Sequence, residues 1–140
     1  MPVEKRETDN GLGVIVIGSG EVTEAEYLEF YTRELTQGML ESQGCRYSLN
    51  DYSEVTSITI STGAIEEIAR YSKGAAEMTR EQVTAIVADK DVIFGLARMW
   101  ELLSSDAQGA VMVFRNRKDA EEWIRREVKD RFQIDTLTFR

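Results

Sequence analysis

The sequence of 140 residues contains no histidine, one cysteine and one proline. The absence of histidine removes the commonest general base and every Ser-His or Cys-His pair of nucleophile and base. It also removes the usual zinc ligands, which the single Cys45 cannot replace. Cys45 has no partner for an internal disulfide, so nothing indicates an oxidising compartment. We therefore expect no catalytic residues, no cofactor and no metal site of the common kinds.

Long hydrophobic runs are also absent. The longest, Val14–Ile17, is far shorter than a membrane span, and Met1–Asn10 is charged and lacks the apolar region of a signal peptide. These two absences predict a cytoplasmic protein with no membrane insertion.

Positive charge is scarce over most of the chain, and the net charge is −8. Residues 1–114 carry 9 basic and 19 acidic side chains, and residues 115–140 carry 8 and 6. The acidic part would repel nucleic acids and anionic membranes. In the basic part, Glu121 and Arg125 are four residues apart, as are Glu122 and Arg126, which is typical of ion pairs on an exposed helix face. We therefore expect no nucleic-acid partner.

The first 20 residues predict a β-hairpin. Val3–Thr8 and Leu12–Gly18 flank Asp9-Asn10-Gly11, and Asn-Gly between two extended segments is a strong hairpin signal. Thr23 and Glu26 have capping-box spacing, which predicts a helix ending near Gly38. Arg46–Leu49 predicts a short strand. Ser57–Ser61 is also β-prone, so the residues between these two segments form either a bend within the sheet or a loop.

Strands and helices alternate along the rest of the chain. A helical period runs from Ile65 to Ser72, and Val83–Ala88 and Ala110–Phe114 are typical of buried strands. Asp89-Lys90-Asp91 provides a turn before a helix whose core face carries Ile93, Leu96, Ala97, Trp100 and Leu103. Asn116 caps the last helix, and residues 132–140 form an extended tail. The pattern predicts one α/β domain, residues 1–140, with helices packed on a mainly parallel sheet.

Gly18-Ser19-Gly20 follows an apolar strand, as in dinucleotide-binding turns. Thr23 stands at the third glycine position, and Glu21 would repel a pyrophosphate. We interpret these glycines as easing a tight turn from strand to helix.

Polar residues at predicted strand ends are the remaining candidates for a ligand-binding loop. Asp51 and Asp89 both follow predicted strands, where α/β folds often place sites. Aspartates at such positions are commonly turn formers and helix caps. A histidine-free enzyme that uses these carboxylates is the alternative hypothesis.

The helix from Asp91 carries a second apolar stripe. Phe94, Arg98 and Leu102 recur every four residues opposite the core face, and Met99 lies at the margin of this stripe. Such a stripe implies burial on two sides. It is covered either by a second subunit, which predicts a homodimer, or by a neighbouring segment of the same chain.

Several stretches together resemble a known family. They are the hairpin, Gly20-Glu21-Val22-Thr23, Val83–Ala88, Phe94–Trp100 and Val113–Ile124. They resemble the STAS fold of anti-sigma-factor antagonists and the small bacterial proteins called SpoIIAA-like, or STAS/SEC14-related. The resemblance implies a mixed, mainly parallel sheet of about five strands with four helices.

The same resemblance implies a modification site. The antagonists have Asp-Ser-Ser-Gly at the helix after the central strand, and the first serine is phosphorylated. Ile60-Ser61-Thr62-Gly63 is the matching stretch, so the resemblance implies Ser61 as the phosphoacceptor. Ile60 replaces the acidic residue, and a helix N-cap is the alternative role for Ser61.

The leading hypothesis is a non-enzymatic binding or regulatory module that binds a protein partner or a small apolar ligand. The alternatives are the histidine-free enzyme and a phospho-regulated anti-sigma-factor antagonist of the STAS type.

Overall fold

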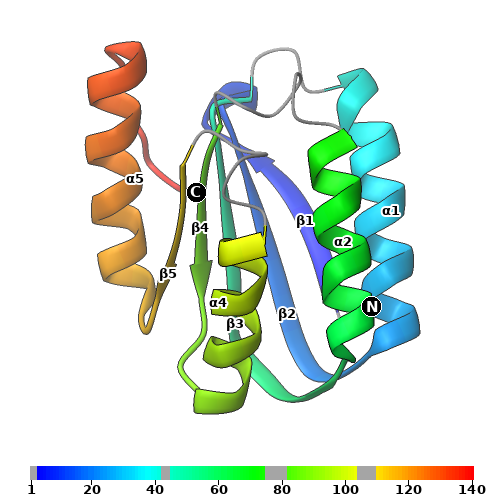
Figure 1. The fold of residues 1–140 in the computed structure, drawn as a ribbon. Helices are drawn as coiled ribbons and strands as arrows, with labels where there is room; N and C mark the ends of the chain where they lie inside the picture. The colour runs from blue at the N-terminus through cyan, green and yellow to red at the C-terminus, as the bar shows by residue number, and fades with distance from the viewer. Residues whose placement is uncertain (1–2, 42–44, 75–81, 104–109) are drawn as a thin grey trace.

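The computed structural model describes residues 3–41, 45–74, 82–103 and 110–140 (Figure 1). At its centre is one sheet of five strands in the order β1-β2-β3-β4-β5. β1 (Val3–Thr8) pairs antiparallel with β2 (Gly13–Thr23). β3 (Tyr47–Thr59), β4 (Val83–Val87) and β5 (Ala110–Phe114) then follow in parallel. The predicted α/β class, the mainly parallel sheet and the hairpin at its edge are confirmed.

Helices cover both faces of the sheet (Figure 1). α1 (Glu24–Glu41), α2 (Thr62–Gly74) and α4 (Asp91–Leu103) lie on one face, where α2 packs against both of the others. α5 (Arg117–Phe132) lies on the opposite face, against β3, β4 and β5. None of these described helices is both long and apolar enough to cross a membrane.

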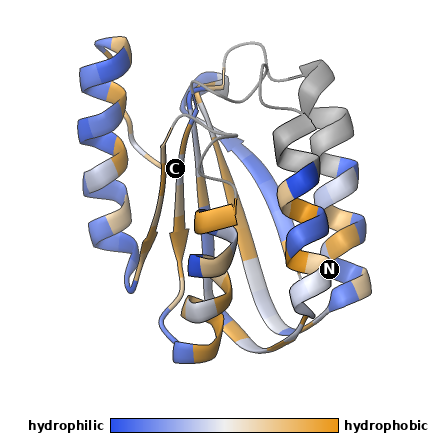
Figure 2. Cartoon of the chain, in the orientation of Figure 1, coloured by the Kyte–Doolittle hydropathy of each residue, from blue (hydrophilic) through white to orange (hydrophobic). Residues whose placement is uncertain are grey.

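The core has two halves, one on each face of the sheet. In β4, Val83, Ala85 and Val87 face α5, whereas Ile86 faces α2 and α4, because side chains alternate along a strand. Both halves exclude water from β4, so its five residues are all buried. Figure 2 shows the result as apolar colour along β4 and β5, whereas α5 is largely polar.

The hairpin turn also fixes the end of the described chain. Asp9 accepts hydrogen bonds from the Tyr47 hydroxyl at 2.5 Å and from the Thr138 N–H and hydroxyl at 2.8 and 2.6 Å. Leu137 and Phe139 are thereby buried against the α5 face. Residues 133–140 form no strand, and Phe139 has a left-handed φ of 58°.

β3 is one continuous strand of 13 residues, where the sequence suggested two short segments. Only Tyr47–Asp51 pairs with β4, but β3 pairs with β2 from Tyr47 to Thr59. Two register shifts in the β2–β3 pairing, one on each side of the Ser19–Gly20 pairs, allow the long strands to bend. Of the two alternatives for the residues between the segments, the bend within the sheet is therefore correct and the loop is wrong, because pairing with β2 holds this polar stretch extended.

Two helix ends differ from expectation. α1 continues past Gly38 to Glu41. Leu103, which the periodicity placed in the core, is 37% exposed. Leu103 is the last residue of α4, where the helix ends.

Both predicted N-caps are confirmed. The Thr23 hydroxyl accepts the Glu26 N–H at 3.2 Å, and the Glu26 carboxylate accepts the Thr23 N–H at 3.2 Å. The Asn116 side chain accepts the Asp119 N–H at 2.9 Å. Short-range polar spacing was enough to predict where these two helices begin.

Candidate functional site

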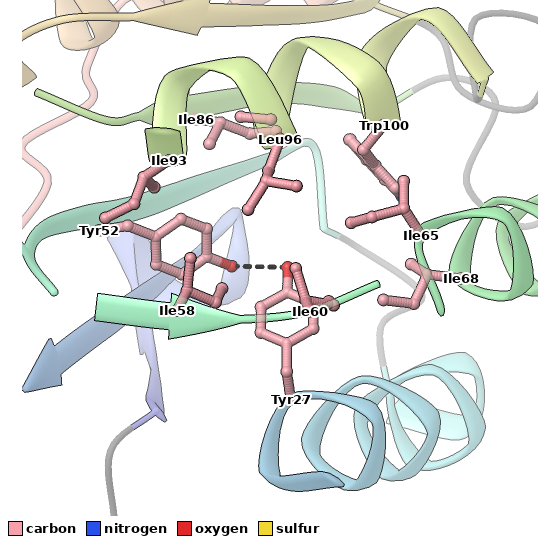
Figure 3. Close-up of a pocket in the computed structure, with 11 residues that line it drawn as sticks. Tyr27, Tyr52, Ile58, Ile60, Ile65, Ile68, Ile86, Ile93, Leu96 and Trp100 are labelled. Atoms are coloured by element: carbon pink, nitrogen blue, oxygen red, sulfur yellow. Dashed lines mark hydrogen bonds between the residues drawn. The ribbon is translucent and has the colours of Figure 1, made fainter. Parts of the chain in front are cut away.

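A partly open pocket lies between the sheet and the layer formed by α1, α2 and α4 (Figure 3). Its cavity volume is about 40 Å³. Most of its wall is aliphatic, and the polar atoms of its side chains belong to two tyrosines and one tryptophan. The lining residues are Tyr27, Tyr52, Ile58, Ile60, Ile65, Ile68, Ile86, Ile93, Leu96, Ala97 and Trp100.

Helical and strand periodicity bring these side chains together. Ile93, Leu96, Ala97 and Trp100 follow the i, i+3, i+4, i+7 spacing of one face of α4. Ile86 is the residue of β4 that points toward this helix layer. Ala97 is the smallest side chain of the pocket wall, so a gap remains between α4 and the isoleucines of α2.

Two tyrosines meet in the pocket. The hydroxyl of Tyr27, from α1, and that of Tyr52, from β3, are 3.1 Å apart, and either one can be the donor. Burial raises the pKa of Tyr52 to about 12, and burial, together with the neighbouring Tyr52, raises the pKa of Tyr27 well above its usual value. Both phenols are therefore neutral at physiological pH. The pair has two hydroxyl hydrogens and uses one in its mutual bond, so among the described residues one hydrogen is left without an acceptor.

Trp100 contributes a second unused donor. Its side chain is 8% exposed, and its Nε1–H is buried with no hydrogen-bond partner within the described part of the chain. Tyr31 lies edge-to-face with the indole at a centroid distance of 6.4 Å, a contact that supplies only a weak interaction. A buried donor without an acceptor costs about 1–3 kcal/mol. The pocket therefore favours an acceptor atom.

Gly18 leaves space for the Tyr52 ring because it has no side chain. A Cβ at Gly18 would lie 2.7 Å from the Tyr52 ring and 2.9 Å from Val55. Gly18 lies inside β2, which runs on to Thr23, so the interpretation of Gly18 and Gly20 as a tight strand-to-helix turn was wrong. Gly18 makes room for an aromatic side chain of the neighbouring strand, and Gly20 adopts a φ of 67° beside a register shift.

Ser61 precedes α2 and is exposed. Its side-chain oxygen accepts the Ala64 N–H at 3.1 Å, which is the geometry of an N-cap. The Ser61 N–H and hydroxyl both donate to the Glu24 carboxylate, at 2.8 and 2.7 Å. These hydrogen bonds from Ser61 lower the pKa of Glu24. A carboxylate of α1 is thus already bound at the N-cap residue of α2.

The two aspartates proposed for a ligand loop lie near the carboxyl end of β4. Asp51 is inside β3 rather than after a strand, and its carboxylate accepts from the N–H and hydroxyl of Ser53 at 3.0 and 2.6 Å. Arg117 lies 3.8 Å from the other oxygen of Asp51. Asp89 follows β4 as expected and pairs with Lys90 at 3.2 Å. No group of three acidic or cysteine side chains able to hold a metal occurs among the described residues.

The proposed interface stripe is divided in the fold. Phe94 and Met99 are half-buried and pack against the core. The Arg115 guanidinium lies 3.9 Å above the Phe94 ring. Arg98 is exposed and pairs with Glu101 at 2.7 Å, and Leu102 is 68% exposed. The subunit interface stays a prediction.

Sequence reasoning missed Tyr27 as a site residue, considered Trp100 only as core, and did not place Tyr52 in a pocket. The one available signal was chemical: a buried tryptophan or tyrosine normally requires a hydrogen-bond partner for its polar atom. Tyr27 and Tyr52 are 25 positions apart, and no local pattern predicts that their hydroxyls meet.

No family model matches the chain, and no curated protein matches it significantly. Solved structures do match. The chain is similar to an uncharacterised protein of the DUF3478 family with a SpoIIAA-like fold from Shewanella loihica, with a TM-score of 0.54 and 15% identity, over 87% of this chain and 91% of that one.

Two further matches are structures of the anti-sigma factor antagonist SpoIIAA. The unphosphorylated form has a TM-score of 0.54 and 9% identity, over 88% of this chain and 97% of that one. The phosphorylated form, from Bacillus, has a TM-score of 0.52 and 10% identity, over 88% and 99% of the two chains. At these identities the likeness establishes the fold, which is SpoIIAA-like, as the resemblance implied.

Proposed function

We propose that this protein is a non-enzymatic binding module that takes a small, neutral, apolar ligand into the pocket between the sheet and α1, α2 and α4. The observation that carries this proposal is the pocket itself, with its aliphatic wall and neutral polar groups (Figure 3). Such a composition is typical of sites for small apolar molecules, which a few well-placed polar groups orient.

The polar groups of the fold support binding more than catalysis. Asp51 is already held by Ser53 and lies beside Arg117. Asp89 is paired with Lys90 at the surface. Neither carboxylate lines the pocket, and the tyrosines that do have raised pKa values that disfavour a role as a base at neutral pH.

We propose a regulatory role for this binding, because α1 connects the pocket with the surface around Ser61. The solved structures of similar fold include an anti-sigma factor antagonist. Tyr27 comes from α1, and Ser61, the position that matches the antagonists' phosphorylated serine, is hydrogen-bonded to Glu24 at the start of the same helix. A ligand that moves α1 would therefore also move the surface around Ser61. A protein partner would recognise that surface.

Self-association is the second part of the proposal. Val92 and Leu102 are 71% and 68% exposed on α4. Two-fold homodimers are the commonest assemblies, and apolar side chains gather in their interfaces. We place the contact on α4, with Leu102 and Arg98 at its centre.

The pocket is tested by NMR of isoleucine methyl groups with 2-methylpropene as the probe. Ile65, Ile68 and Ile86 line the pocket, whereas Ile15 and Ile124 lie on the other side of the sheet and serve as internal controls. We expect saturable shifts in the first group only. Shifts in neither group, or equal shifts in both, would sink the proposal.

A matched pair of variants locates the binding site. Ala97→Val adds two methyl groups to the pocket wall and should abolish the shifts. Ala25→Val makes the same change at an exposed position of α1, with the same small cost in helix propensity, and should leave them unchanged. Equal probe binding by both variants would place the ligand elsewhere.

A further inference from the structure

We propose that the pocket selects ligands that carry one uncharged acceptor oxygen, of the ketone, aldehyde or ester class, and that the Trp100 Nε1–H donates to it. This inference rests on the proposed function, because it names the chemistry of the ligand in the same pocket.

The count of hydrogens in the pocket requires an acceptor. The indole Nε1–H of Trp100 can only donate, and it is buried without a partner within the described part of the chain. The hydroxyls of Tyr27 and Tyr52 hold two hydrogens and use one between them. A hydrocarbon would leave the indole donor unsatisfied, whereas an acceptor oxygen removes that cost.

The absence of charge among the lining residues requires a neutral acceptor. Every residue of the pocket wall is aliphatic or an uncharged aromatic. A carboxylate or phosphate there would lose its hydration with no cation to compensate, which is far costlier than the loss of one hydrogen bond. The raised pKa values of Tyr27 and Tyr52 show the same penalty for negative charge at this place.

The volume limits the group that enters. A cavity of about 40 Å³ holds about three water-sized groups, at roughly 10–15 Å³ each. That is enough for a carbonyl with one or two small alkyl neighbours and too little for a long acyl chain. A larger ligand would place only its carbonyl group and the adjacent small alkyl groups inside the pocket.

An ordered water is the competing occupant. Water also has an acceptor oxygen, and buried waters commonly bridge two or three polar groups. The aliphatic wall favours a ligand whose carbonyl carbon carries alkyl groups, because such a ligand also buries apolar surface. The test must therefore separate a carbonyl from a bound water.

Acetone and 2-methylpropene make the decisive probe pair, since they have the same shape and differ in C=O against C=CH2. The first measurement follows the Nε1–H signal of Trp100 in the unmodified protein, by ¹H–¹⁵N NMR. We expect a saturable downfield shift with acetone and a much smaller shift with 2-methylpropene, which has no acceptor atom. Trp123, on the opposite face of the sheet, supplies a second indole signal that neither probe should move.

The second measurement compares affinities in Trp100→Phe, with Trp123→Phe as the matched control. Trp100→Phe should weaken acetone about 2- to 12-fold relative to 2-methylpropene, the range for one neutral hydrogen bond. The ratio between the two probes cancels any general change in the pocket. The control should leave that ratio unchanged.

Three results would overturn the inference or its premise. If both probes bind and Trp100→Phe affects them equally, the acceptor selectivity is wrong, although the pocket proposal stands. The same conclusion follows if the Trp100 Nε1–H keeps a cross-peak to bound water at saturating acetone. If neither probe binds, the proposed function itself fails.

Discussion

Ser61 shows how one side chain can carry two interpretations. Its oxygen caps α2 through the Ala64 N–H, and its own N–H and hydroxyl bind Glu24. A phosphate on this oxygen would gain from the free N–H groups and dipole of α2 but would face the Glu24 carboxylate. The two carboxylate contacts favour the capping role.

We expect Ser61→Ala to behave as a cap deletion, lowering the free energy of unfolding by about 0.5–2 kcal/mol. Urea denaturation measures this change. Ser57→Ala, at an exposed position of β3, is the control and should change stability by less. Phosphorylated Ser61 in protein isolated from its native host would contradict a purely capping role.

Asp9 makes a second residue-scale prediction, in which pH is the variable. Burial raises the pKa of this carboxyl, but hydrogen bonds from Thr138, Tyr47 and Phe139 outweigh burial, so the pKa lies below its ordinary value of 3.8. Its contribution to stability is therefore fully present above pH 3.8 and is lost as pH falls below that value through the folded-state pKa.

We expect Asp9→Asn to lower the free energy of unfolding by about 1–3 kcal/mol at pH 7, because at least one donor to Asp9 loses its acceptor. The difference between variant and unmodified protein should shrink below pH 3.8. Urea denaturation at pH 7 and pH 3 measures both values. Asp135→Asn, at an exposed position, should show neither effect. A difference that grows at low pH would refute this account of Asp9.

At the scale of elements, the close approach of β2 to β3 at Gly18 makes room for Tyr52, which lines the pocket. We expect Gly18→Ala to destabilise the fold by about 1–3 kcal/mol, because the new methyl group would overlap Tyr52 and Val55. Gly95→Ala is the control. It meets nothing within 4 Å on α4 and should stabilise by up to about 1 kcal/mol. Thermal denaturation of the two variants should therefore shift in opposite directions, and shifts in the same direction would contradict this packing.

The elements also show what the sequence could predict. The hairpin and the helix starts at Thr23 and Asn116 follow from short-range spacing, because a cap and its partner are three residues apart. The continuity of β3 does not follow from short-range spacing. Its stretch Asn50–Thr56 is polar, and it is extended because β2 pairs with it from more than 30 residues away.

The pocket could not be predicted from the sequence either, because it also depends on contacts between distant segments. The inward face of α4 was predicted from its period, apart from Leu103, but a period cannot tell a filled core from one with a gap. The gap depends on how Ala97 faces α2 and on where Tyr27 and Tyr52 meet. These are contacts between elements, which only the assembled fold determines.

At the scale of the whole molecule, we predict that the protein self-associates through the outer side of α4. We expect Leu102→Glu to give a folded monomer in sedimentation velocity, because a buried, unpaired carboxylate is costly in an interface. Glu29→Gln, at an exposed position of α1, is a neutral control. The unmodified protein should be a dimer at tens of micromolar, and finding it monomeric there would end the dimer proposal.

The central claim is that the gap between α1, α2 and α4 is a ligand site. A crystal of this protein under xenon pressure tests it most directly, because xenon enters small apolar cavities and its anomalous signal locates it. We expect a xenon atom in contact with Ile65, Leu96 and Trp100, and none there in Ala97→Val. Xenon bound only on the α5 side of the sheet, or an unchanged site in the filled variant, would contradict the claim.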